Sequence, residues 1–145
     1  MRRTVLASPP SEVLLDRVLH DVDPRVRANA IEVLEAKPKL DYVPMLAARA
    51  RSRQSSSRER ANAIKALHRM KIGVAAPQLL AMLQDGRPEH RISAMWALRQ
   101  VGIWQMLHEV GKMAKQDENI RVRRYALTVL RTVADMMAEK GKVMA

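Results

Sequence analysis

The chain has 145 residues, the length of a single domain, and 48% of them are apolar, which is enough for a continuous core. It has no cysteine, which excludes disulfides and thiolate metal sites, and no stretch approaches the roughly 20 apolar residues of a membrane span. The net charge is +11, and residues 51–100 hold ten basic against three acidic side chains, so a basic surface that attracts anionic partners is expected. We expect a soluble, cytoplasmic protein.

One cassette occurs four times along the chain. Its copies begin at Arg27, Arg60, Arg91 and Arg123, with spacings of 33, 31 and 32 residues. Within each copy the apolar residues recur at helical spacing. A period in the low thirties with helical patterning predicts a solenoid of stacked helices.

Each repeat is expected to hold a first helix, called A, a short turn and a second helix, called B. In the first repeat Asp23 is a suitable N-cap, Pro24 fits the first helical position, and Pro38 ends the helix that follows. In chain order, the predicted A and B helices cover residues 11–20 and 24–36, 40–51 and 57–70, 74–84 and 88–101, and 103–115 and 120–138.

These helices predict one domain over residues 1–145. It is divided into repeats at about 11–37, 40–70, 74–101 and 103–138, and residues 139–145 are expected to form a frayed tail.

The chain resembles the HEAT family, especially the short HEAT-like repeats of phycobilin lyases and of bacterial scaffold proteins. The resemblance lies in the Asp-Pro before the first B helix, in Val26-Arg27, Ala30 and Leu34, and in their counterparts downstream. It implies an all-α, armadillo-like fold: a right-handed α-α superhelix of about four helix pairs. The A helices would then lie on the convex side and the B helices on the concave side.

The second repeat departs from this pattern. Gln54 and Ser57 replace the Asp and Pro of the first repeat, and the turn after Arg49 is longer. The sequence therefore predicts a distortion or a mobile loop at this turn.

Two columns of the cassette are identical in all four copies and predict the core. Alanine allows close approach of helices, and leucine fills the space between layers. The predicted core residues are Ala30, Ala63, Ala94 and Ala126, and Leu34, Leu67, Leu98 and Leu130.

A third column consists of the four arginines. Six residues before each of them stands Asp21, Gln54, Asp85 or Asp117, respectively. Guanidinium groups can donate to both carboxylates and loop carbonyls. HEAT-like arrays have similar Asp and Arg positions that join neighbouring turns. We therefore predict a structural ladder made of Asp21, Asp85, Asp117, Arg27, Arg60, Arg91 and Arg123.

The side of the B helices opposite the core gathers basic and aromatic residues. An aromatic pair beside a basic strip is typical of a contact surface, with Trp96 as its anchor. The alternative is that Trp96 packs under a neighbouring helix. The predicted partner-binding residues are Arg58, Asn62, Lys65, Arg69, Trp96 and Tyr125.

The sequence offers no pattern for catalysis, a cofactor or a metal. The four histidines are scattered, and there is no phosphate-binding glycine loop or nucleophile elbow. The favoured function is therefore a non-catalytic scaffold whose concave side binds a protein with an acidic surface. Nucleic-acid binding on the same basic side is the alternative. A glycosylase-like activity has only Glu89 near Trp96 in its favour, and a phycobilin-lyase-like activity rests on fold analogy alone.

Overall fold

The structure is a computed structural model that describes the backbone of residues 11–144 and the side chains of residues 13–142. Within these residues it contains helices and turns but no strand. Residues 1–10 and Ala145, which belong to the predicted single domain, lie outside the described residues.

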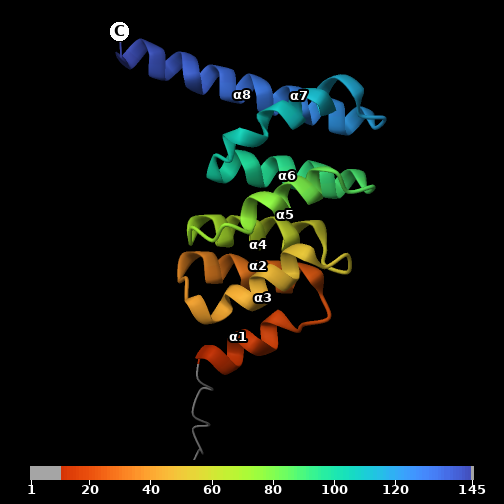
Figure 1. The fold of residues 1–145 in the computed structure, drawn as a ribbon. Helices are drawn as coiled ribbons and strands as arrows, with labels where there is room; N and C mark the ends of the chain where they lie inside the picture. The colour runs from red at the N-terminus through yellow and green to blue at the C-terminus, as the bar shows by residue number, and fades with distance from the viewer. Residues whose placement is uncertain (1–10, 145) are drawn as a thin grey trace, which may run out of the picture.

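Four helix pairs follow one another along the chain and stack in one column, from α1 at one end to α8 at the other (Figure 1). This arrangement confirms the predicted all-α solenoid. The pairs are α1 (Ser11–Leu19) with α2 (Pro24–Ala36), α3 (Val43–Arg51) with α4 (Ser57–Arg69), α5 (Ala75–Leu83) with α6 (Pro88–Val101), and α7 (Leu107–Gln116) with α8 (Ile120–Met144). Two short 3-10 helices, η1 (Leu40–Tyr42) and η2 (Trp104–Met106), precede α3 and α7.

The helix ends follow from local side chains. Asp23 caps α2 by accepting from the Arg25 amide at 2.8 Å, and Asn119 accepts from the Arg121 amide at 2.9 Å at the start of α8. At the other end of α6, Gly102 adopts a left-handed φ of 73°, which a residue with a Cβ rarely takes. These short-range signals explain why the predicted boundaries lie close to those observed.

The last helix is longer than the sequence predicted. It continues to Met144, through most of the segment expected to be a frayed tail. No proline interrupts it, and Gly141 weakens a helix without ending it. All side chains from Ala134 to Lys142 are exposed, so this last part of α8 adds no buried side chain to the core.

The B helices form the continuous layer of the stack. Helix α2 packs on α4, α4 on α6, and α6 on α8. Helices α1, α3 and α7 pack mainly on their own B helices, whereas α5 packs about equally on α4 and α6. Successive A helices have few contacts with one another. The alanine columns explain the close B layer, since Ala63, Ala94 and Ala126 are fully buried and keep the helices near each other.

Seven of the eight predicted core residues are buried, and Leu67 and Leu98 are fully inaccessible. The prediction for Leu130 was wrong, because this side chain is only half-buried. Its neighbour Val129 is fully buried, as are Val122 and Ala126 of the same helix. Among the described residues, α8 lacks the following B helix that packs on α2, α4 and α6.

Candidate partner-binding face and the ladder beside it

Each interior arginine of the cassette holds two turns at once. The guanidinium of Arg91, which is 7% exposed, donates from Nη1 to the carbonyl oxygen of Asp85 at 2.9 Å. Its Nε and Nη2 atoms donate to the carboxylate of Asp117, in the next repeat, at 2.9 and 2.8 Å. One side chain therefore closes its own turn and binds the following one.

Arg60 and Arg123 follow the same geometry in part. Arg60 donates from Nη1 to the Asp85 carboxylate at 2.8 Å, and from Nε to the Ala50 carbonyl at 3.0 Å. Arg123 donates to the Asp117 carbonyl at 2.5 Å. The carboxylates of Asp85 and Asp117 thus each bind the arginine of the preceding repeat, whereas their backbone carbonyls bind the arginine of their own repeat.

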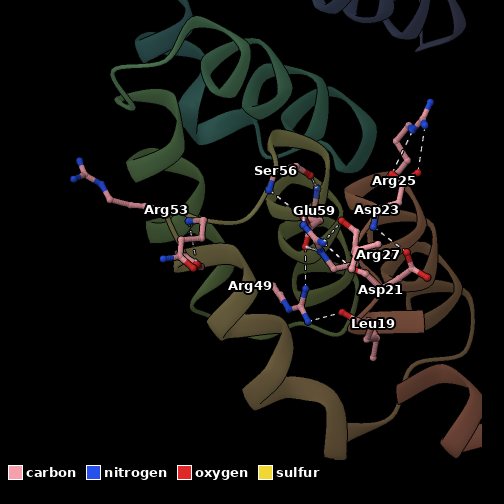
Figure 2. A network of polar contacts seen from close by, with 12 residues as sticks. Leu19, Asp21, Asp23, Arg25, Arg27, Arg49, Arg53, Ser56 and Glu59 are labelled. Atoms are coloured by element: carbon pink, nitrogen blue, oxygen red, sulfur yellow. Dashed lines mark hydrogen bonds and ion pairs between the residues drawn. The ribbon is translucent and has the colours of Figure 1, made fainter. Parts of the chain in front are cut away.

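The second repeat replaces its missing aspartate by a different acid. Gln54 has no carboxylate, and Arg27 instead donates to Glu59 of α4 from Nε and Nη2 at 3.1 and 3.0 Å (Figure 2). Arg49 donates to the same carboxylate at 2.9 Å and to the Leu19 carbonyl at 2.6 Å. The predicted distortion is therefore an exchange of ligands, in which an acid five residues further along the chain takes over the ladder contact.

Glu59 also caps its own helix. Its carboxylate accepts from the Ser56 amide at 3.1 Å, and the Ser56 hydroxyl accepts from the Glu59 amide at 3.2 Å, which is a capping box. The spacing of Ser56 and Glu59, three residues apart, is the sequence signature of this cap. It did not indicate that the same side chain, 1% exposed, would join two arginines from α2 and α3.

The ladder acids are held in their charged form. Burial raises the pKa of Glu59, but hydrogen bonds from Arg27, the Ser56 amide and Arg49 outweigh it and lower that pKa. The pKa of Asp117 is lowered in the same way, because the contacts from Arg91 outweigh burial. For Asp85 the hydrogen bond from the Arg87 side chain is the largest cause, and it places the pKa far below its usual range.

A buried histidine joins this network. His90 is 3% exposed, and its Nδ1 atom lies 3.1 Å from Nη1 of Arg60. Arginine can only donate, so Nδ1 accepts and the ring is neutral. Burial is the main reason that the pKa of His90 is lowered, and the cations Arg87 and Arg60 add to it against the opposing effects of Asp85 and Glu89.

The lowered pKa predicts an acid-sensitive stability. The unfolded histidine takes up a proton near pH 6.5, whereas the folded one resists it to lower pH. The free energy of unfolding should therefore fall as the pH drops below about 6.5, and urea titrations at pH 7.5, 6.5 and 5.5 should measure this. His90→Gln, which keeps an acceptor for Arg60, should flatten the dependence, whereas the exposed His108→Gln should not. Equal slopes in His90→Gln and the unsubstituted protein would contradict the assignment.

The six residues predicted to bind a partner differ in accessibility. Arg58 and Arg69 are exposed, and Trp96 and Tyr125 are half-buried. The prediction that all six lie on a column free of core contacts was wrong for Asn62 and Lys65, which are 2% and 5% exposed. The B helices stack so closely that this column also carries contacts between repeats.

Those contacts tie three B helices together. Asn62 donates to the Ala28 carbonyl of α2 at 3.0 Å. The Nζ atom of Lys65 lies 3.3 Å from a carboxylate oxygen of Glu35, and Arg69 forms an ion pair with the same carboxylate. Lys65 also lies over the ring of Trp96, 4.5 Å from its centroid, so the indole is held by a cation–π contact.

Tyr125 lies one repeat further along, on α8. Burial raises the pKa of its phenol, with a smaller opposing effect from Arg99. For Trp96, one side of the ring packs on Lys65 of the preceding B helix, and the residue as a whole keeps some exposure.

One apolar cavity of about 480 Å³ lies at the first repeat, between α1, α2 and η1. Its walls include Leu14, Val18, Val33 and Tyr42. The described residues contain no group of three or more His, Asp or Glu side chains placed to hold a metal. None of the helices described has the combination of length and hydropathy needed to cross a membrane.

The comparison with known families agrees with the repeat geometry. The family model described as HEAT repeats matches residues 11–99, which is more than half of the chain. No curated protein matches the chain. The match covers the first three helix pairs, and the fourth pair repeats their arginine contact and their stacking. The chain therefore belongs to the HEAT-repeat family.

Proposed function

We propose that this protein is a non-catalytic binding module that docks an acidic partner protein on the B-helix face. This face is defined by the exposed Arg58 and Arg69 and the half-buried Trp96 and Tyr125. HEAT repeats generally act as scaffolds for protein interactions, and a stack of four rigid pairs offers an extended surface for this. The close packing of successive B helices supports their position on the inner, concave side of the curve.

The observation that carries the proposal is the position of Trp96. Its ring is held in place by Lys65, which is itself fixed by Glu35, and the residue still keeps accessible surface. A large aromatic side chain that is ordered before binding loses little entropy when a partner covers it. Tyr125 on the next B helix extends the same aromatic strip.

The charge of the chain favours a protein partner over nucleic acid. Half of the ten basic residues between positions 51 and 100 form ion pairs with carboxylates of the protein itself. These are Arg60, Lys65, Arg69, Arg87 and Arg91. The basic charge counted from the sequence is therefore partly neutralised, which reduces the number of phosphates that this region can bind.

The test uses partners isolated from the native host and compares variants by binding kinetics. Trp96→Ala should mainly speed dissociation, because it removes the anchor. Arg58→Glu should slow association, most strongly at low salt, because it removes a steering charge. Glutamate is favourable near the start of α4, so the helix should be kept. The control is Lys115→Glu, the same charge change on the A-helix side of the stack.

Two outcomes would contradict the proposal. If Trp96→Ala and Arg58→Glu bind the partner with unchanged rates, the B-helix face is excluded as the docking site. Tight binding of a 20-base-pair DNA duplex that weakens at least about tenfold between 50 and 200 mM salt would instead favour nucleic acid, because release of counterions from several phosphates causes that dependence.

A further inference from the structure

The two ends of the stack leave open the contacts that every interior repeat makes. The position four residues after the cassette arginine is fully buried in the first three repeats, as Ile31, Ile64 and Met95. In the last repeat this position is Leu127, and it is 43% exposed. This column therefore faces the following repeat, and α8 presents it uncovered.

The opposite column is open at the other end. The position six residues after the arginine is fully buried in the second, third and fourth repeats, as Ala66, Ala97 and Val129. In the first repeat it is Val33, which is 54% exposed. This column faces the preceding repeat, so α2 presents at the start of the stack the surface that α4, α6 and α8 bury.

The ladder is also incomplete at both ends of the stack. The residue left without its ladder partner is an arginine at one end and an aspartate at the other. Inside the stack, the arginine of one repeat binds the aspartate of the next, as in Arg60 with Asp85 at 2.8 Å. Among the contacts of the described residues, Arg123 donates to a carbonyl of its own turn and to no carboxylate. The carboxylate of Asp21 accepts from the Asp23 amide, and from no arginine within the part of the chain that the structure describes.

Two further positions repeat this complementarity. Glu35 and Lys65 pair across the first junction, eight and five residues after their cassette arginines. At the open ends the same two positions are Arg131 and Glu32, which are both exposed and have opposite charges. Asn62 also binds the Ala28 carbonyl of the preceding repeat. In the first repeat the equivalent residue is Asn29, which is exposed.

The apolar surfaces match as well. We define the C-terminal end face by Arg123, Leu127, Leu130 and Arg131, and the N-terminal end face by Asp21, Asn29, Glu32 and Val33. The 480 Å³ apolar cavity is lined by Asn29 and Val33 of the N-terminal end face. Inside the stack, the column of Ile31, Ile64 and Met95, the column of Leu34, Leu67 and Leu98, and the positions that correspond to Val33 are all buried. Leu127 and the half-buried Leu130 stand in those same two columns.

We propose that a second copy of this chain docks its N-terminal end face on the C-terminal end face of the first, and so continues the stack head to tail. Arg123 of one copy then binds Asp21 of the next, Arg131 lies against Glu32, and Leu127 and Leu130 enter the apolar cavity. The contact is heterologous and leaves one open face on each end of a dimer, so it propagates into short oligomers at high concentration. This interface does not use the B-helix face of the proposed function.

The test blocks one face at a time with a buried charge. Leu127→Asp blocks the C-terminal end face, and Val33→Asp blocks the N-terminal end face. In sedimentation velocity between about 10 µM and 1 mM, a range that includes dissociation constants of weak contacts, the unsubstituted protein should increase in mean mass with concentration. Each variant alone should stay monomeric, and an equimolar mixture should form a dimer and nothing larger. The control is Val74→Asp, since Val74 has the same 43% exposure but lies far from both end faces, and it should associate like the unsubstituted protein.

A charge exchange tests the ladder contact. Arg123→Asp or Asp21→Arg alone should weaken association at least tenfold, and the chain with both substitutions should recover it, since the pair is restored with reversed signs. Circular dichroism checks that each variant is folded. The proposal is overturned if the unsubstituted protein remains monomeric throughout the concentration range. It is also overturned if either blocked variant still dimerises alone, because that result indicates a symmetric contact through a single face.

Discussion

Replacing Glu59 by alanine should lower the free energy of unfolding by about 3 kcal/mol or more, since removing one partner of a buried ion pair leaves charges without compensation. Glu59 is 1% exposed, and its carboxylate binds Arg27, Arg49 and the Ser56 amide. The substitution leaves two guanidinium groups, both less than a quarter exposed, without their shared acceptor. The first two repeats should therefore lose the contact that joins their turns.

Two matched variants separate the cap from the ladder. Ser56→Ala removes only the hydroxyl of the capping box and should cost about 1 kcal/mol. Glu59→Gln keeps an acceptor at the third helical position but loses the charge, so its cost should lie between those of Ser56→Ala and Glu59→Ala. Urea unfolding at pH 7 measures all three. Equal losses for Glu59→Ala and Ser56→Ala would show that the ion pairs to Arg27 and Arg49 contribute nothing.

Leu67→Ala should lower the free energy of unfolding by roughly 2–5 kcal/mol, because it opens a cavity in the middle of the stack. Leu67 is fully buried on α4, which packs against α2, α3, α5 and α6. In a solenoid each repeat is stabilised by its neighbours, so a cavity at this position weakens the contacts on both sides.

The control is the same substitution in the same column. Leu130→Ala removes an identical side chain from a half-buried position, and it should cost clearly less than Leu67→Ala. The surface substitution Leu40→Ala, at a residue 74% exposed, should change stability by no more than about 0.5 kcal/mol. Equal losses at Leu67 and Leu130 would contradict the assignment of the open end to α8.

The repeat architecture could be predicted because it depends on local and periodic signals. The spacing of the four arginines indicated the number of helix pairs, and Asp23-Pro24 located the start of the first B helix. Such signals act within a few residues, so they can be read without knowledge of the neighbours. The alanine and leucine columns likewise indicated which side of each B helix is buried, since the same side must face its neighbours in every repeat.

The use of each remaining side chain was decided only by tertiary structure. The sequence treated Lys65 and Asn62 as free surface, yet both are buried, because the spacing between stacked B helices determines which side chains the next helix covers. The sequence pattern predicted Asp85 and Asp117 as members of the ladder. It could not show that each carboxylate binds the arginine of the preceding repeat, a contact that spans about 25 residues. The sequence pattern also missed Glu59. This acid makes the ladder contact in place of an aspartate, but it lies five positions away from the expected position and so does not keep the spacing of the repeat. The exposure of Leu127 and Val33 was decided in the same way: identical columns are buried or open according to whether another repeat follows or precedes them, a property of the stack and not of the residue.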